Sequence, residues 1–164
     1  MKDIDQFKTK ETTKWKTSRG TTPTTKWKPG EVVEGCIVPK GWGEELIIEN
    51  NEMYCGKLLK FNAGCKFSMH YHMVKDETWY VNAGEFIYRW IDTETAEVKT
   101  IKLYPGDVVR HIPGQPHQLE ALTIGVVFEV STQHKDSDSY RVMKGDEQGR
   151  KTKDVVGRRH NLNI

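Results

Sequence analysis

Hydrophobic and polar positions alternate over short stretches along most of this chain, which is the pattern expected of β-strands. Turn residues separate the stretches, for example at Asn50-Asn51, Gly84 and Pro105-Gly106. The pattern predicts strands in the segments 45–49, 53–61, 66–73, 79–81, 85–91, 98–103, 108–112, 119–122 and 125–131. Many short strands with turns between them favour a sandwich or barrel over alternating strands and helices. We therefore expect an all-β domain, with helix confined to a few residues near its ends.

The segment 64–84 holds two histidines, two residues apart, followed by a glutamate. On a β-strand His70 and His72 point to the same side, whereas on a helix they would lie on nearly opposite sides. Glu77 follows a short turn and can return its carboxylate to the same point. A third imidazole, His117, comes later in the chain. Three imidazoles and one carboxylate facing one cavity would form a transition-metal site with open coordination positions.

These segments resemble the two motifs of the cupin superfamily. The first reads G-x5-H-x-H-x4-E-x6-G without a gap, and the second keeps Gly106, Asp107, Gly114 and His117 at the family's separations. The second motif departs from the family where proline and asparagine are usual, at Ile112 and Ala121. The resemblance implies a double-stranded β-helix, the jelly-roll barrel of cupins, with extended N- and C-terminal arms. It also implies one divalent metal, whether Zn, Fe, Mn, Ni or Co, held by His70, His72, Glu77 and His117.

Other potential ligands are expected not to bind the metal. His111, His134 and His160 fit no ligand spacing, although His111 lies close to the second motif. The three cysteines, Cys36, Cys55 and Cys65, form no C-x-x-C pair, so free thiols are expected. Cys65 is either close to the metal or a small packed side chain. The alternative for the whole site is a barrel that has lost its metal.

The charge distribution divides the chain into three parts. Residues 1–30 carry eight Lys or Arg against three acids, and residues 150–164 carry five against one. With a net charge of +2, the remainder carries about −7, from 2 − 5 − 4. We expect a basic N-terminal arm at 1–30, a barrel at 31–149 and a basic C-terminal tail at 150–164. The basic ends lack a nucleic-acid recognition motif, so solvated tails are the simpler interpretation.

Composition excludes some classes of protein. The 164 residues suffice for one domain, and the mean hydropathy of −0.69 suits a soluble β-protein. No apolar run approaches the length of a membrane span, and the N-terminus lacks the apolar core of a signal peptide. We therefore expect a cytoplasmic protein with no membrane or nucleic-acid partner.

A narrower resemblance connects about residues 40–150 with the cupin domain of type II mannose-6-phosphate isomerases. The matching segments are Gly41-Trp42-Gly43, Lys75-Asp76-Glu77-Thr78-Trp79, Phe128-Glu129-Val130, Asp138-Ser139-Tyr140-Arg141 and Asp146-Glu147-Gln148-Gly149-Arg150. Lys75 replaces an arginine of that family, Gln148 replaces a tyrosine, and His70 stands where glutamine is frequent. The nucleotidyltransferase domain that often accompanies the family is absent from this sequence. The His-Tyr-His segment is also similar to cupin-type phosphoglucose isomerases.

The resemblance implies a phosphorylated sugar as the small-molecule substrate, and a phosphate needs fixed cations. Arg141 and Arg150 are the candidates that the resemblance supplies, and Lys75 is a candidate at the rim. Lys66 is expected in the cavity because it shares strand parity with His70. For each of these cations, the alternative interpretation is a solvated residue on the surface.

The leading functional prediction is aldose–ketose isomerisation of a hexose 6-phosphate through a metal-stabilised ene-diolate. Glu77 is a candidate for the proton-transfer base, with Lys66 as a second catalytic candidate. The alternatives are an iron-dependent dioxygenase and a non-catalytic sugar- or effector-binding cupin. Large apolar residues on strand faces turned away from the metal predict a homodimer.

Overall fold

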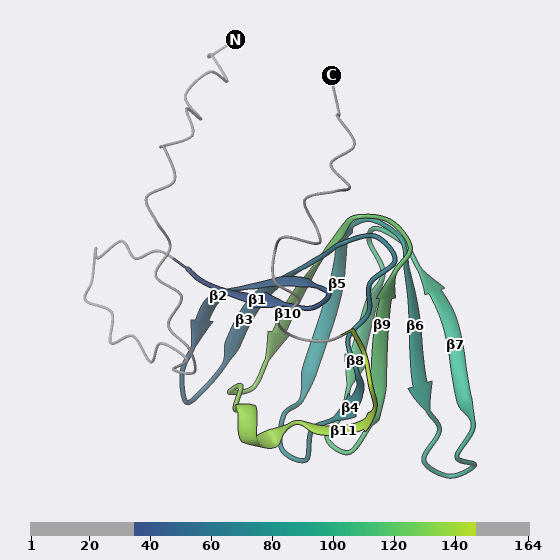
Figure 1. Ribbon diagram of the computed structural model, residues 1–164. Coiled ribbons are helices and arrows are strands. Elements are labelled where there is room, and N and C mark those ends of the chain that lie inside the picture. The colour runs from purple at the N-terminus through teal and green to yellow at the C-terminus, as the bar shows by residue number, and fades with distance from the viewer. Residues whose placement is uncertain (1–34, 147–164) are drawn as a thin grey trace, which may run out of the picture.

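The structure is a computed structural model that describes residues 35–146, so the predicted arms at 1–30 and 150–164 lie outside the described residues. Two antiparallel sheets make up nearly all of the described chain (Figure 1). The six-stranded sheet has the order β1 (Cys36–Lys40), β2 (Gly43–Asn50), β3 (Cys55–Phe61), β10 (Gly125–Ser131), β5 (Glu77–Ala83), β8 (Val108–His111). The five-stranded sheet has the order β11 (Tyr140–Met143), β4 (Met69–Tyr71), β9 (His117–Ala121), β6 (Phe86–Ile91), β7 (Val98–Leu103).

The strand pattern predicted from the sequence is confirmed in most places. Strands β7 and β10 have the predicted bounds, 98–103 and 125–131. The only helix among the described residues is a short 3-10 turn at Asp136–Asp138, which precedes β11. No helix in residues 35–146 is long and apolar enough to cross a membrane.

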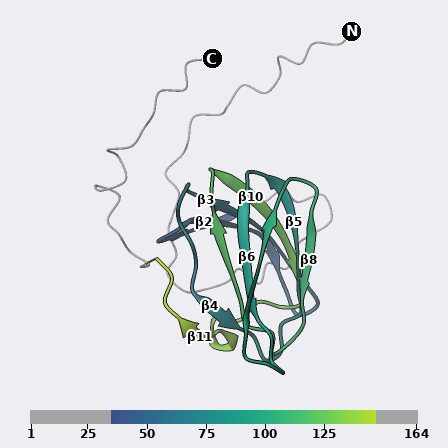
Figure 2. The same ribbon diagram turned by 90° about the vertical axis from the view of Figure 1, so that its right-hand side faces the viewer.

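The two sheets pack against each other (Figure 2), and apolar side chains fill the space between them. They come from both sheets, and the burial pattern of Gly125–Ser131 in β10 alternates as expected for a strand with one face on a core. Aromatic rings meet edge to face or stacked at the centre, with the centroids of Trp42 and Phe61 separated by 4.3 Å. The core consists of Trp42, Leu59, Phe61, Phe67, Trp79, Val81, Phe86, Tyr88, Leu103, Leu119, Ala121 and Val127.

The inner face of the six-stranded sheet changes from apolar to polar along its strands. Val127 of β10 lies opposite Leu59 of β3 and Val81 of β5, all of them buried. Two residues further along β10, Glu129 lies opposite Lys57, and both are buried as well. One end of the barrel is therefore an ordinary apolar core, whereas the other end encloses charged side chains.

Two motif glycines fix connections between strands, Gly84 at the apolar end of the barrel and Gly114 at the polar end. Gly84 joins β5 to β6 with φ of 90°, and a Cβ there would lie 2.6 Å from the Cα of Gly125. Gly114 has φ of 84°, and its N–H donates to the carbonyl oxygen of His72 at 2.7 Å. This hydrogen bond ties the first motif directly to the second.

The prediction that residues 66–73 form one continuous alternating strand is wrong. Regular pairing is limited to β4, and Lys66 makes only an isolated bridge with Glu120. Alternation over 66–73 predicts Phe67 on the face away from His70 and His72, but the alternation does not persist between Lys66 and β4. The ring of Phe67 instead packs 5.1 Å from the ring of His70, inside the core.

The outer face of the six-stranded sheet carries an apolar row that crosses every strand. Strand register and the alternation of burial place one apolar residue of each strand at the same level on this face. All of them are half-buried or exposed, with Val108 63% exposed. The row consists of Ile37, Leu46, Leu58, Phe128, Tyr80 and Val108. The homodimer stays a prediction, and this row is its candidate contact surface.

If a second copy covers the row, the purified protein should have about twice the 19.0 kDa mass of one chain in light scattering. Leu58→Glu places a charge at the middle of the row and should yield the single-chain mass. Lys99→Glu in β7 of the other sheet is the control and should leave the mass doubled. A wild-type protein with the mass of one chain would contradict the prediction.

Candidate metal centre

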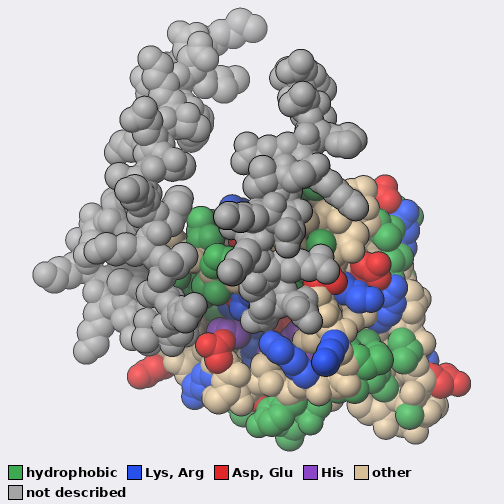
Figure 3. Space-filling model, viewed as in Figure 1, with side chains coloured by type: hydrophobic (Ala, Val, Ile, Leu, Met, Phe, Trp, Pro, Cys, Tyr) green, Lys and Arg blue, Asp and Glu red, His purple; other side chains and the backbone are tan. Residues whose placement is uncertain are grey.

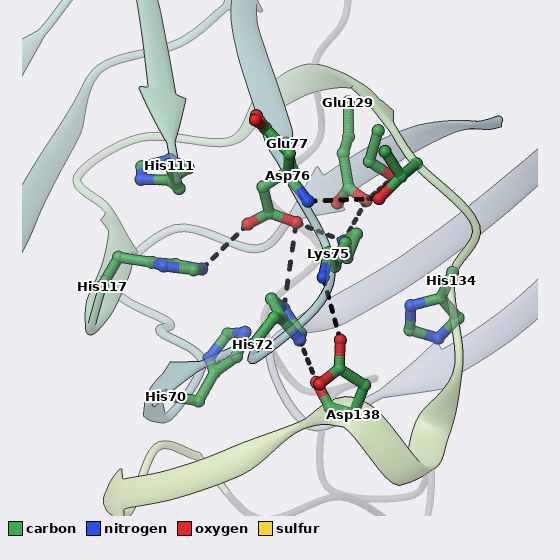
Figure 4. A network of polar contacts seen from close by, with 12 residues as sticks. His70, His72, Lys75, Asp76, Glu77, His111, His117, Glu129, His134 and Asp138 are labelled. Carbon is green, nitrogen blue, oxygen red and sulfur yellow. Dashed lines mark hydrogen bonds and ion pairs between the residues drawn. The ribbon is translucent and has the colours of Figure 1, made fainter. Parts of the chain in front are cut away.

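Three histidines come together at the polar end of the barrel (Figure 4). His70 lies in β4, His72 follows that strand, and His117 begins β9. In the antiparallel pairing of β4 with β9, His70 lies directly opposite His117, which puts both side chains on the same face. The candidate ligand atoms of the three residues lie within 4.8 Å of one another. The structure thus joins the two sequence motifs in one cluster.

Backbone carbonyls fix the orientation of all three imidazoles. Nδ1 of His70 lies 2.8 Å from the carbonyl oxygen of Ser68, and Nδ1 of His117 lies 2.9 Å from that of Gln115. Nδ1 of His72 contacts the carbonyl oxygen of Asp138. Because a carbonyl can only accept, each Nδ1 carries the proton and each Nε2 keeps its lone pair. This is the tautomer in which histidines bind metals through Nε2.

The surroundings of His70 and His72 favour the neutral imidazole. Burial lowers the pKa of His70 to about 3, with a further contribution from His117. Burial also lowers the pKa of His72, although Glu77 partly offsets this. Neutral imidazoles are the form that a metal requires, so the site is ready to bind at neutral pH.

Glu77 begins β5 and places its carboxylate beside the histidines. One oxygen, Oε1, lies 2.9 Å from Nε2 of His117, and the other, Oε2, lies 3.9 Å from Nε2 of His72. Burial alone would raise the pKa of Glu77, but Lys75 and His117 hold it well below its usual range. The carboxylate is therefore ionised and adds a negative charge to the cluster.

The contact between Glu77 and His117 tests whether these residues suit a metal. Nε2 of His117 is buried and has no hydrogen-bond partner among the described residues. In the tautomer fixed by Gln115 it presents a lone pair, and at 2.9 Å it faces a carboxylate oxygen, which is also an acceptor. Two acceptors so close together repel each other unless a cation or proton lies between them. The donor set thus fits a divalent transition metal.

The prediction that Lys75 lies at the rim of the site is wrong. Its side chain is 4% exposed, and its ammonium group contacts Oε2 of Glu77 and lies 2.5 Å from Oε1 of Glu129. Burial would lower the pKa of Lys75, but the two carboxylates raise it above its ordinary value. An alternating strand pattern could not reveal this burial, because Lys75 lies in the turn before β5.

Asp138 organises the turn that carries His72, a role that the sequence did not reveal. Its carboxylate accepts hydrogen bonds from the backbone N–H groups of Met73, Val74 and Lys75 at 2.8 to 3.1 Å. Its own carbonyl oxygen contacts His72. The segment 138–141 did attract notice through the resemblance, but no spacing rule connects it with a turn more than 60 residues earlier.

His111 lies next to the cluster without joining it. Its ring stacks on that of His117 with centroids 4.2 Å apart, and its Nδ1 lies 3.2 Å from the hydroxyl oxygen of Tyr88. Burial, followed by His117, holds the pKa of His111 well below its usual range. The group of three histidines that the structure brings together does not include His111 or His134, and His160 lies outside the described residues.

Of the other predicted site residues, Arg141 and Lys66 belong to the described part of the chain. Arg141 is exposed on β11 directly opposite His70, so register places it on the face of the histidines. Lys66 is half-buried, and its backbone pairs with Asp146. Arg150 lies outside the described residues. In the view of Figure 3, histidine side chains reach the surface, and Lys and Arg side chains lie beside them.

No protein-family model matches the chain, and no curated protein matches it in sequence. Solved structures do match. Capsular polysaccharide assembling protein CapF from Staphylococcus aureus has a TM-score of 0.61 and 16% identity over 70% of this chain and 33% of CapF. Oxalate decarboxylase from Bacillus subtilis has a TM-score of 0.58 and 16% identity over 66% of this chain and 30% of its own.

KdgF from Halomonas sp. has a TM-score of 0.50 and 21% identity, over 57% of this chain and 81% of KdgF. The chain has the cupin fold. It spans about a third of the length of CapF and of oxalate decarboxylase. At these identities the comparisons show the fold alone, so the chemistry of this protein has to be argued from its own residues.

His117→Ala should weaken metal binding on the order of 100-fold or more, because it removes one of three convergent nitrogens. Titration with Zn²⁺ in a calorimeter measures the loss. His111→Ala is the matched control: it removes a second buried imidazole stacked on the first, yet it should leave the affinity unchanged. Equal losses in the two variants would contradict the assignment.

The metal-free protein should lose thermal stability as the pH falls from about 6.5 towards 4. Burial lowers the pKa of His70 to about 3, and burial together with Lys57 lowers that of His134 to about 4. Below the ordinary histidine pKa of 6.5 the unfolded chain therefore binds protons that the folded chain does not, which favours unfolding. Calorimetric melting after chelation measures this, and a melting temperature that is constant or rises on acidification would contradict it.

Proposed function

We propose that this cupin binds one divalent transition metal and isomerises a phosphorylated sugar, converting an aldose to a ketose. The observation that carries the proposal is the placement of Arg141 opposite His70, on the same face as the three histidines. A metal-binding group and a phosphate-binding group can then contact one small substrate from neighbouring strands. CapF, a capsular polysaccharide assembling protein, adds a carbohydrate context among proteins of this fold.

The chain supplies the parts that such a reaction needs. His70, His72 and His117 would hold the metal, which provides Lewis acidity at the sugar oxygens. Arg141 would hold the phosphate, and its planar fork suits two phosphate oxygens at once. Glu77 is ionised and lies beside the histidines, so it is the candidate to accept the proton that moves between adjacent carbons. Lys66 and Arg150 stay predictions as further site residues.

A non-catalytic sugar-binding role is the second candidate, and one contact favours it. The carboxylate of Glu77 is bound to Lys75, and a base with a tight counter-ion accepts a proton less readily. A protein of this kind would bind the sugar phosphate without turnover. The three-histidine cluster also suits an iron-dependent dioxygenase, whose substrate would need no phosphate-binding cation.

Metal-loaded protein should bind one of mannose, glucose or fructose 6-phosphate, raise its melting temperature with that ligand, and interconvert it in a coupled assay. Arg141→Ala should weaken sugar-phosphate binding about tenfold, because a charge-assisted hydrogen bond is lost, and leave metal content intact. Arg110→Ala is the control, since this exposed arginine of β8 pairs with Asp76 instead.

The outcomes separate the candidate functions. Binding with turnover supports the isomerase, and binding without turnover supports the sugar-binding role. Metal uptake without any response to sugar phosphates would contradict both and favour the dioxygenase.

A further inference from the structure

Strand register aligns the histidine cluster with an aromatic side chain in one row across the five-stranded sheet. His70 of β4 lies directly opposite Arg141 of β11 on one side and opposite His117 of β9 on the other. His117 in turn lies directly opposite Trp90 of β6. Directly opposite residues of antiparallel strands share a face, with Cβ atoms about 5 Å apart. Trp90 is therefore the neighbour of the histidines on the side away from Arg141.

The ring of Trp90 is the part of the aromatic core that solvent reaches next to this cluster. Along the inner face of β6, Phe86 and Tyr88 are buried, at 0% and 6% exposed, whereas Trp90 is half-buried. The rings of Trp90 and Tyr88 are stacked, with centroids 5.1 Å apart and 13° between their planes. This stacking fixes the orientation of the indole. The accessible part of the ring is then available to a ligand bound beside His117.

The edge strand β7 leaves this side of the site open to solvent. Ile101, on the inner face of β7 opposite Tyr88, is 50% exposed, because β7 ends the five-stranded sheet (Figure 1). Lys99 lies opposite Trp90, and its ammonium group contacts the carboxylate of Asp92. The cation at this end of the row is thus already paired. This end therefore suits an uncharged, partly apolar portion of a ligand, whereas a charged group is better placed at the opposite end of the row.

We infer that Trp90 is a specificity-determining residue, which stacks on the apolar face of a pyranose ring while the phosphate of the sugar faces Arg141. This inference rests on the sugar-phosphate binding proposed above and names the form of the sugar that the site takes. The axial C–H groups of a hexopyranose form a flat apolar face that an aromatic ring can cover, and the open-chain form has no such face. Isomerisation then requires the ring to open: the C1–O5 bond breaks, C1 and O1 form a carbonyl, and the O1 proton passes to O5.

The test compares ring-locked and open-chain ligands. The 6-phosphates of 1,5-anhydromannitol and 1,5-anhydroglucitol are cyclic and cannot open, whereas the 6-phosphates of mannitol and glucitol are always open. None of them can be isomerised, so calorimetric titration of the Zn²⁺-loaded full chain measures binding without turnover. Wild-type protein should bind at least one anhydrohexitol phosphate more tightly than the matching hexitol phosphate.

Trp90→Ala should weaken binding of the ring-locked ligand about tenfold and leave the hexitol phosphate unchanged. A stacked face that removes about 60 Å² of apolar surface from water contributes roughly this factor. Trp90→Phe keeps a flat ring and should retain most of the affinity, whereas Trp90→Leu keeps an apolar side chain without the flat ring and should lose as much as Trp90→Ala. Each variant should still bind one Zn²⁺ per chain, because Trp90 is not a metal ligand.

Tyr104→Ala is the matched control. Tyr104 is a second accessible aromatic residue, 48% exposed, but it follows β7 at the end away from the histidine row. Its removal should leave the affinity for both kinds of ligand unchanged. Should Trp90→Ala fail to fold, Trp90→Leu and the ligand preference of the wild type still decide.

Two sets of results would overturn the inference in different ways. A wild-type protein that binds hexose or hexitol 6-phosphates but no anhydrohexitol phosphate, or Trp90→Ala and Trp90→Leu variants that bind the ring-locked ligand as tightly as the wild type, would overturn the role of Trp90 and leave sugar-phosphate binding intact. A Zn²⁺-loaded wild type that binds none of these phosphates and no hexose 6-phosphate would overturn the proposed function, and this inference with it.

Discussion

The contact of Lys75 with Glu77 and Glu129 is the interaction on which the polar end of the barrel depends. Removing one partner of such a buried set costs roughly 3–5 kcal/mol, because the remaining charge has no solvent and no counter-ion. Replacing the whole set by apolar residues would often cost nothing. Its presence is therefore better explained by what it positions than by the stability it contributes. It places the carboxylate of Glu77 beside three imidazoles. Lys75 also keeps this carboxylate ionised, whereas burial alone would favour its protonated form.

The second constraint is the orientation of the histidines. Each imidazole donates through Nδ1 to a backbone carbonyl, and two of these carbonyls belong to the residue two positions earlier in the same segment. The third comes from Asp138, whose carboxylate also closes the turn after His72. The orientation of the rings is thus set by the backbone of two motifs and one 3-10 turn. Burial then keeps the rings of His70 and His72 neutral, so neither the tautomer nor the charge of these two residues has to change when a metal binds.

Much of the fold could be read from the sequence, since strand alternation and turn residues act locally. The bounds of β7 and β10 were predicted, because both strands lie between clear turns and β10 also alternates regularly. Strands β1 and β11 were not predicted as strands, since both lie at the edge of a sheet and are poorly buried. Strict alternation over 66–73 gives the wrong face for Phe67, because alternation holds only where pairing is continuous, and pairing lapses between Lys66 and β4.

The sequence by itself determined the fold class and the three histidines, because a strand's two-residue period and the motif spacing already place them on one face. The tertiary structure alone decided what surrounds them. The sequence predicts that Lys75 is an exposed residue of a turn. It is buried instead, because Glu129, 54 residues later, supplies its counter-charge. Arg141 was suggested only by resemblance, and strand register sets it opposite His70. Charge pairs and strand register bring together residues that are far apart in the chain. The local pattern of hydrophobic and polar residues therefore cannot predict either of them.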